Sequence, residues 1–236
     1  FLLGFVGALL FSILFGALLD LVINRPLKDE SVFSIIMATI SISIILRAGT
    51  AMIVGPLTHI PESPFGNRVI SIGDVTIAIL DLFIIISAVV LVIFFYLFFN
   101  KTKWGVAMQA TAEDPMAAQL MGIPIKKVYR NGWIFSAMVA TVGGILLAPR
   151  TLLDTNMGYL GLKAFPAAVL GGFGSIPGAI VGGVMLGVIE TLSLGTLSYN
   201  FAWIKEINDV IVWIVLIVVL MIRPAGIFGR EEIKKV

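Results

Sequence analysis

The chain has 236 residues, of which 59% are hydrophobic and 13% are charged, and its formal net charge is +2. A soluble domain carries about a quarter charged residues, so much of this chain's surface is expected to face lipid. The small net charge argues against a nucleic-acid partner, and the absence of cysteine excludes disulfides, thiolate metal sites and a cysteine nucleophile.

Four apolar segments are long enough to cross a bilayer as helices, and a fifth is slightly short. A spanning helix needs about 20 mostly apolar residues. The four are Phe1–Ile23, Val32–Val54, Val75–Phe99 and Ile207–Ile222, and the fifth is Gly132–Pro149. The first begins directly in apolar sequence with no charged leader, so we expect that an N-terminal piece precedes the numbered chain.

The basic residues predict the orientation, because cytoplasmic loops carry an excess of Lys and Arg. One group marks the loops expected to be cytoplasmic, including the C-terminal tail 223–236, and consists of Arg25, Lys28, Lys101, Lys103, Lys126, Lys127, Arg130, Arg223, Arg230, Lys234 and Lys235. The others lie on or near the opposite side and are Arg47, Arg68, Arg150, Lys163 and Lys205. The only histidine, His59, lies in a polar loop and is interpreted as solvated.

Arg47, Asp81 and Glu190 are charged residues within apolar stretches, where each charge costs about 2.5–3.5 kcal/mol on insertion scales. Arg47 lies in the outer half of its segment and is interpreted as extending toward the outer surface. Asp81 and Glu190 are expected either to solvate a transport pathway or to pair across an interface. Three scattered charges do not form a proton relay, and neither catalytic residues nor a metal site are expected.

The polar stretch 101–130 is the most informative cytoplasmic segment. A short helix is predicted over Thr111–Met121, with Asp114 as its N-cap. Pro115 then takes the first helical position, and Gly122 stops the helix. Such a helix can lodge in a groove of a soluble partner or rest on lipid headgroups. The expected knob of small and apolar side chains, with an acidic pair at its start, consists of Glu113, Asp114, Ala117, Ala118 and Met121.

The stretch Lys163–Leu197 is too short for two ordinary spans. Because segment 132–149 is expected to lead outward and segment 207–222 back to the cytoplasm, the stretch between them must make no net crossing. Its glycine-rich centre disfavours one continuous helix, since Gly costs about 1 kcal/mol and Pro about 3. We predict a helix to about Leu170, a break, and a second helix capped by Ser175 with Pro177 in its first turn. The residues assigned to this broken helix are Gly171, Gly172, Gly174, Ser175, Pro177, Gly178, Gly182 and Gly183.

Two functions remain open for this broken helix. Broken helices at membrane depth often mark substrate pathways, because only protein or a water-filled cavity can cover their free backbone groups. The small residues Gly178, Gly182 and Gly183 also have the spacing of a close helix–helix interface.

The run Ala117–Gly122 is similar to the core of the EAA loop of binding-protein-dependent ABC permeases, which is the coupling helix that docks on the ATPase. Met116 stands where that loop usually has a glutamate. Two further stretches resemble the branched-chain amino-acid ABC permeases: Gly161–Glu190, with Gly-Ser-Ile-Pro-Gly-Ala at its centre, and Arg223–Gly229, which is like their C-terminal motif. Family members begin with further spans carrying an Asn-Phe-Ala-His-Gly motif that is absent here, which fits truncation at the N-terminus.

The resemblance implies an all-α polytopic membrane protein in which residues 1–236 form a single permease domain. About six membrane-embedded segments are expected, one of them a broken or re-entrant helix. The protein would lie in a prokaryotic cytoplasmic membrane and form the channel subunit of an ATP-driven importer for leucine, isoleucine and valine.

The resemblance also implies several partners. The chain lacks a Gly-x4-Gly-Lys-Ser/Thr loop, so it is expected to bind no cofactor and to leave ATP and Mg to two separate ATPase subunits. An extracytoplasmic binding protein would deliver the substrate. A paralogous permease would complete the pathway as a heterodimer surrounded by lipid, although a homodimer also fits. Gly178, Gly182 and Gly183 are candidates for packing against that second permease.

Three alternatives compete with this interpretation. An ABC permease of the same kind can serve urea, short amides or other amino acids. An ion-coupled secondary transporter would also have broken helices but would work without ATP. A membrane scaffold without a transport role would leave the embedded charges and the broken helix without a purpose.

Overall fold

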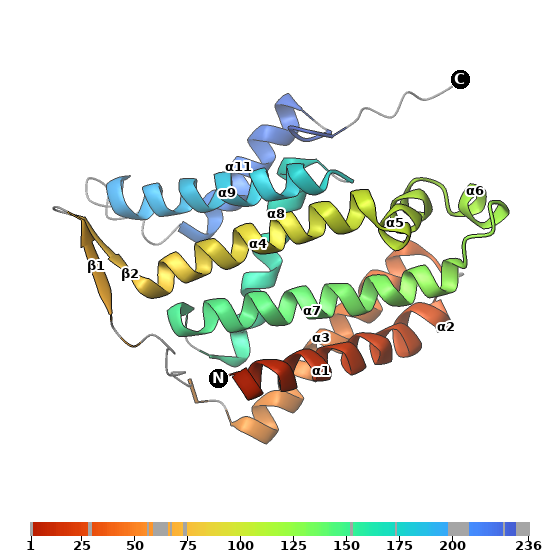
Figure 1. The fold of residues 1–236 in the computed structure, drawn as a ribbon, viewed down its shortest axis with the longest axis horizontal. Coiled ribbons are helices and arrows are strands. Elements are labelled where there is room, and N and C mark those ends of the chain that lie inside the picture. Colours follow the sequence, from red (N-terminus) through yellow and green to blue (C-terminus); the bar gives the residue numbers. More distant parts are fainter. Residues whose placement is uncertain are drawn as a thin grey trace. The chain divides into compact units, whose positions relative to one another are not determined.

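The computed structural model describes residues 2–27, 30–55, 57–58, 66, 68–72, 75–151, 153–172, 174–197, 208–223 and 225–229. It divides into two compact units, Phe1–Asn156 (unit 1) and Met157–Val236 (unit 2), and each is described by itself (Figure 1). Some of the residues interpreted from the sequence lie outside the described ones: Lys28, His59, Lys205, Arg230, Lys234 and Lys235.

Unit 1 begins with one long helical segment. It consists of α1 (Leu2–Leu19), a π-helical turn (Asp20–Asn24) and α2 (Arg25–Leu27), and α1 packs along α7 (Ile125–Thr151). A Cβ on Gly16 would lie 2.8 Å from the Cα of Ile134, so the two helices approach this closely only because residue 16 has no side chain.

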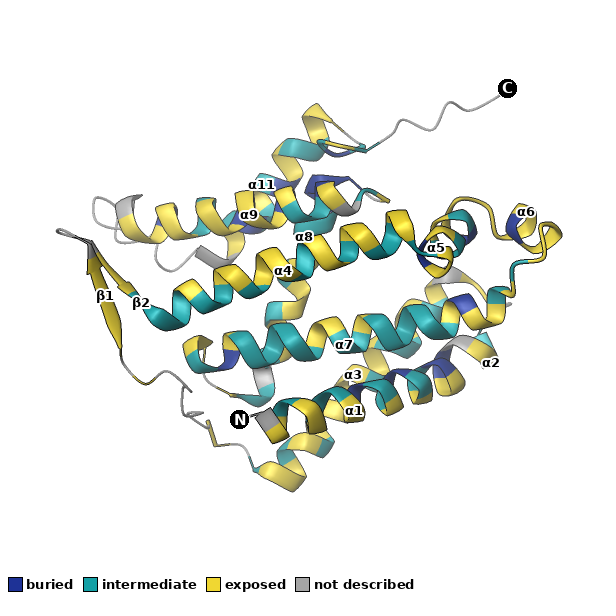
Figure 2. Cartoon of the chain, in the orientation of Figure 1, coloured by how far each residue is buried: buried dark blue, intermediate teal, exposed yellow. Residues whose placement is uncertain are grey.

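Two further apolar helices of unit 1 are α3 (Val32–Val54), which has the predicted bounds, and α4 (Ile79–Lys101). The Ser31 side chain caps α3 by accepting a hydrogen bond from the Ser34 amide at 3.2 Å. No residue in the apolar windows of α3 and α4 is buried (Figure 2). Apolar helices without a buried face need lipid or another protein around them.

The predicted start of the third apolar segment at Val75 is wrong. Residues Val75–Ala78 form strand β2, which pairs antiparallel with β1 (Val69–Ile72), and α4 begins only at Ile79. Hydropathy does not distinguish an apolar strand from an apolar helix, whereas the β-branched residues Val75, Thr76 and Ile77 favour the strand.

Two helix boundaries around the polar stretch also differ from the prediction. The expected helix Thr111–Met121 is two helices, α5 (Lys103–Glu113) and α6 (Pro115–Leu120), because the residue before a proline is disfavoured in helical conformation. Asp114 accordingly has extended angles, φ −148° and ψ 100°. The expected Gly132–Pro149 helix starts earlier, at Ile125, so the last residues of the 101–130 stretch belong to α7.

Unit 2 is built on a helical hairpin. Helix α8 (Gly158–Gly171) is followed by a break and by α9 (Ile176–Leu192), which continues as a π-helical turn, Ser193–Leu197. The break, the Ser175 cap and the position of Pro177 in the first turn of α9 are confirmed. The two helices run antiparallel, since Gly171 contacts Gly178 near the turn and Lys163 contacts Glu190 at the other end.

The core of unit 2 contains Leu170 from α8, Leu186 from α9 and Val212 from α11 (Asn208–Ile222). Because α8 and α9 run antiparallel, the end of α9 lies near the end where α8 began.

Five helical segments among the described residues are long and apolar enough to cross a membrane. They are Leu3–Leu27, Phe33–Val54, Ile79–Lys101, Ile125–Thr151 and Pro177–Gly195. The described part of α11 has 15 residues, which is about 22 Å of helix and shorter than a typical span.

Candidate functional site

Helix α6 is a short helix whose ends are both fixed by local sequence. The carboxylate of Asp114 accepts hydrogen bonds from the amides of Met116 at 2.9 Å and Ala117 at 3.0 Å, so the predicted N-cap is confirmed. At the other end the Gly122 amide donates to the Gln119 carbonyl, and the Ile123 amide donates to the Ala118 carbonyl, each at 3.0 Å.

These two bonds form a Schellman motif, which requires a left-handed residue after the helix. Gly122 supplies it with φ +82°. The stop predicted at Gly122 is thus confirmed, and α6 is capped at both ends.

Helix α6 carries large apolar side chains that project away from unit 1. Met116 is 75% exposed, Leu120 84% and Met121 83%. Ala118 is buried at 4% exposure, so its side chain packs inside the unit. The exposed side chains of Met116, Leu120 and Met121 are hereafter called the α6 knob.

The remaining residues assigned to this segment are all exposed: Glu113, Asp114, Ala117 and Gly122. The sequence did not lead us to assign Leu120 to the site, and Met116 was noted only because the EAA loop usually has a glutamate at that position. Their i, i+4 spacing, which puts both on one helical face, is the signal that could have found them.

The α6 knob is joined to the long helices by a tight connection. Thr102 caps α5 by accepting a hydrogen bond from the Gly105 amide at 3.0 Å, and its hydroxyl donates to the Phe98 carbonyl at 2.7 Å. A Cβ on Gly105 would lie 2.6 Å from the Cα of Phe99, so the turn from α4 into α5 depends on that glycine.

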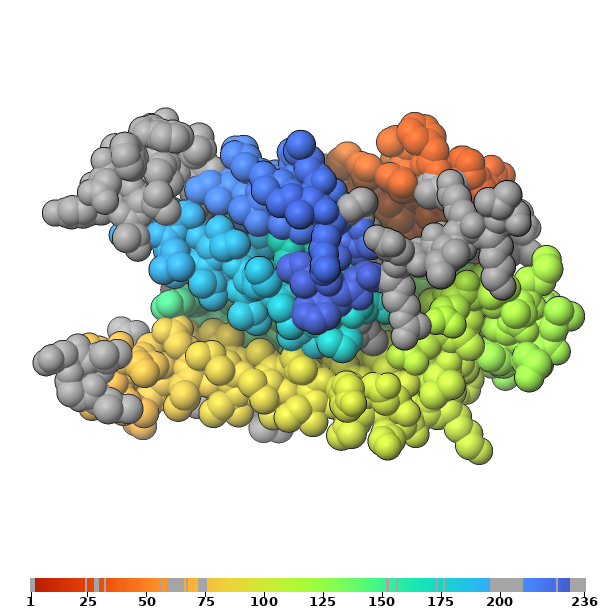
Figure 3. Space-filling view, turned by 90° about the horizontal axis from the view of Figure 1, so that it is seen from above, coloured from red at the N-terminus to blue at the C-terminus, as the bar shows by residue number. Residues whose placement is uncertain are grey.

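Both α5 and α6 also contact α7. Helix α6 lies at the end of unit 1 opposite the β1–β2 hairpin (Figures 1 and 3). These contacts connect α6 to α7 directly, and to α4 through α5, at one end of the unit.

The glycine-rich break brings the backbones of α8 and α9 into direct contact. A Cβ on Gly178 would overlap the Gly171 carbonyl, and a Cβ on Gly182 would lie 2.9 Å from the Gly171 amide nitrogen. Gly178 and Gly182 thus pack within the hairpin, while Gly183 is exposed, with its nearest neighbour, the Ala167 Cβ, 3.8 Å from a built Cβ. Gly174 is exposed at the turn, where it has φ +86°.

The C-terminal motif closes over the end of α8. The amides of Ile227 and Phe228 donate to the carbonyls of Leu170 at 2.9 Å and Gly171 at 3.0 Å. These carbonyls lie at the helix end, where they have no partner within α8. A Cβ on Gly172 would overlap the Gly229 amide. The segment 225–229 is hereafter called the C-terminal clasp, and it joins two sequence motifs whose contact the sequence alone did not reveal.

The charges embedded in apolar segments lie in different settings. Asp81 pairs with Arg150 at 3.4 Å, and Glu190 pairs with Lys163 at 2.6 Å, both within the chain. Arg47 is exposed on α3.

Sequence reasoning missed Asp20, which is 1% exposed and lies 3.4 Å from the Arg25 Nε. The sequence signal that could have identified Asp20 is the presence of an acidic residue near the end of an apolar segment. Within the part of the chain that the structure describes, no cluster of His, Asp and Glu is arranged to hold a metal ion.

These features define a multi-pass α-helical membrane protein built around a broken-helix hairpin and an exposed, doubly capped helix. Residues 1–220 match the family described as the permease component of the branched-chain amino acid transport system. The chain belongs to this family, and it is a transport subunit rather than an enzyme.

Several curated relatives are also named as permease proteins of a branched-chain amino acid transport system. The chain is 34% identical to the high-affinity branched-chain amino acid transport system permease protein LivH of Escherichia coli, over 99% of this chain and 76% of the relative. It is 32% identical to the corresponding permease protein BraD of Pseudomonas aeruginosa, with the same coverage. No solved structure matches the chain significantly.

Proposed function

We propose that this chain forms half of the membrane pathway of an ATP-driven importer for the branched-chain amino acids leucine, isoleucine and valine. Family membership and the names of LivH and BraD support this substrate class. The structural observation that carries the proposal is the α6 knob, because three large exposed apolar side chains on one short helix are typical of a surface that a protein partner covers.

The α6 knob is proposed to dock in a groove of an ATPase subunit. A short helix presents its apolar face to a hydrophobic groove in many complexes, and the knob supplies three such anchors. Closure of the ATPase subunits would push α6 against α5 and α7. The exposed acidic residues Glu113 and Asp114 stand beside the knob, where they can contact the same partner.

The proposed orientation puts α6 and the C-terminal clasp on the cytoplasmic side, in a prokaryotic cytoplasmic membrane. The basic residues Lys101, Lys103, Lys126, Lys127 and Arg130 lie around α5 and α6, as the positive-inside rule requires of a cytoplasmic end. The opposite end of unit 1, with the β1–β2 hairpin, would then receive the extracytoplasmic binding protein.

The remaining partners are a paralogous permease, in a heterodimer, and two ATPase subunits that hold ATP and Mg. The sequence has no phosphate-binding loop of its own, which supports a separate site for ATP. Exposed Gly183 on α9 remains a candidate for close packing against the second permease.

Uptake of labelled leucine into vesicles that hold the complete transporter tests this proposal. We expect uptake that requires ATP and that excess urea leaves unchanged. Leucine uptake without ATP would instead favour an ion-coupled carrier. Transport of urea but not leucine would be consistent with the ABC mechanism and would contradict the proposed substrate.

A further inference from the structure

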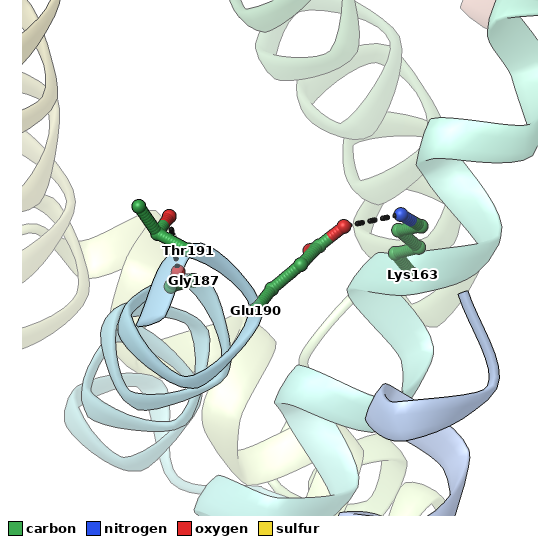
Figure 4. Close-up of polar contacts among 4 residues, drawn as sticks. All are labelled: Lys163, Gly187, Glu190 and Thr191. Carbon is green, nitrogen blue, oxygen red and sulfur yellow. Dashed lines mark hydrogen bonds and ion pairs between the residues drawn. The ribbon is translucent and has the colours of Figure 1, made fainter. Parts of the chain in front are cut away.

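An ion pair joins the two helices of the α8–α9 hairpin at the end away from the turn (Figure 4). The Nζ of Lys163 lies 2.6 Å from the Oε1 of Glu190, and the two side chains extend toward each other. Lys163 is 20% exposed and Glu190 26%, so each side chain is mostly enclosed but can still be reached. Glu190 lies within the apolar span Pro177–Gly195, where charges usually face a protein interior or a water-filled cavity.

The hairpin has other contacts that hold its helices together. Backbone atoms of α8 and α9 already meet at Gly171, Gly178 and Gly182, and Leu170 and Leu186 share the core. An enclosed ion pair requires the desolvation of two charges, and apolar residues in its place are often equally stable or more stable. Stability alone therefore does not account for these two charges.

The helix changes geometry directly beyond Glu190. A π-helical turn, Ser193–Leu197, follows α9, and buried Ser193 donates its hydroxyl hydrogen bond to the Ile189 carbonyl at 2.7 Å. Single π-helical turns inside helices are frequent at functional sites. The ion pair thus lies beside a local departure from regular helix.

The Lys163–Glu190 pair also differs from the other ion pairs among the described residues. Asp81 and Arg150 are 3.4 Å apart, and Arg150 is 61% exposed. Asp20 and Arg25 lie on one continuous helical segment. Of the described pairs, Lys163–Glu190 alone is short, links two helices and encloses most of both side chains.

We infer that Lys163 and Glu190 form a binding site for the zwitterionic backbone of the transported amino acid, an inference that rests on the proposed function. Lys163 would bind the α-carboxylate, and Glu190 would bind the α-ammonium. An α-amino acid carries these opposite charges on groups attached to one carbon, so it can lie head to tail along the pair. Each protein charge then contacts a substrate group of opposite sign.

This arrangement selects by charge. The site is neutral when empty and stays neutral when a zwitterion binds, whereas a cation or an anion would leave a net charge at membrane depth. A neutral amide such as urea offers neither full charge to the pair. The apolar side chain of leucine, isoleucine or valine would contact the apolar surface around the hairpin.

Photolabelling tests this site directly. The complete transporter in lipid nanodiscs is labelled with a leucine analogue that carries a diazirine in its side chain, and ATP-dependent leucine uptake is measured on the same preparation in vesicles. We expect the label on α8 and α9 around Lys163 and Glu190. Leucine should displace it at least tenfold more effectively than leucinamide, which lacks the carboxylate, or isocaproate, which lacks the ammonium.

Substitutions separate binding from folding. Glu190→Gln and Lys163→Met should each lower the labelling at least tenfold, whereas Asp81→Asn, which breaks the Asp81–Arg150 pair between α4 and α7, should leave it unchanged. The double exchange Lys163→Glu with Glu190→Lys keeps an ion pair between the helices but reverses its direction. We expect this variant to assemble and to label weakly.

Three results would overturn the inference in a complex whose wild type imports leucine. They are a label located away from the hairpin, equal displacement by leucine and leucinamide, and a double-exchange variant that labels and transports like the wild type. A wild-type complex that fails to import leucine with ATP would instead contradict the proposed function.

Discussion

At the scale of single residues, the absence of a side chain is what allows the α8–α9 hairpin to close. Gly182 and Gly183 are neighbours on α9, but only a Cβ built on Gly182 meets the backbone of α8. A built Cβ on Gly182 overlaps the Ala167 carbonyl, which is backbone and cannot rotate away. The pair thus offers a matched comparison between a packed glycine and an exposed one.

We expect Gly182→Ala to lower the free energy of unfolding by about 1–3 kcal/mol, the usual cost of overpacking. Gly183→Ala should change it by less than about 0.5 kcal/mol, as exposed substitutions usually do. Thermal unfolding of the purified permease in detergent measures both. Equal effects of the two substitutions would contradict the packing described for the hairpin.

The Asp114 cap is a second residue with a defined local role. Asp114→Ala removes the acceptor for the Met116 and Ala117 amides and should destabilise α6 by about 1 kcal/mol. Since α6 is proposed to dock on the ATPase, we expect less leucine transported per ATP hydrolysed. Asp114→Asn keeps the cap and should keep the ratio; a loss as large as that of the alanine variant would point to the charge instead.

At the scale of elements, the sequence predicted those features that local chemistry determines. The bounds of α3, the break after α8, the Ser175 cap and the Gly122 stop all follow from apolar length, capping side chains and glycine. Hydropathy misplaced the starts of α4 and α7, because apolar character neither excludes a strand nor limits a helix that extends into polar sequence.

The candidate site was less predictable than the fold. The sequence located α6 but included Ala118 in the expected partner-facing knob, whereas Ala118 is buried. Which face of so short a helix packs inward depends on its contacts with α5 and α7, and the sequence does not specify these contacts. The C-terminal clasp and the Lys163–Glu190 pair join residues far apart in the chain. Such contacts depend on how the helices pack, which spacing along one chain does not specify.

The C-terminal clasp gives a test at this scale. Ile227→Pro removes the amide that donates to the Leu170 carbonyl, and an unpaired buried carbonyl costs about 1–3 kcal/mol. We expect a lower unfolding temperature and faster proteolysis of unit 2. Phe228→Ala keeps its backbone amide, and its side chain is half exposed, so it serves as the control. Similar stability of the two variants would argue against the clasp.

At the scale of the whole molecule, the orientation in the membrane can be tested with single introduced cysteines, since residues 1–236 contain none. Cysteines at exposed Gln119 on α6 and exposed Thr76 on β2 report the two ends of unit 1. We expect an impermeant thiol reagent to label the Thr76→Cys variant in intact cells and the Gln119→Cys variant only after permeabilisation. The reverse pattern would contradict the proposed cytoplasmic position of α6.

The central claim is that the α6 knob couples ATP hydrolysis in separate subunits to movement of the substrate through this chain. The most direct measurement is the ratio of leucine transported to ATP hydrolysed by the reconstituted transporter, for the wild type and for the double variant Met116→Ser with Leu120→Ser. Gln119→Ala, an exposed polar position on the same helix, is the matched control. We predict that the ratio falls at least tenfold in the double variant and stays unchanged in the control. An unchanged ratio in both variants would contradict the claim.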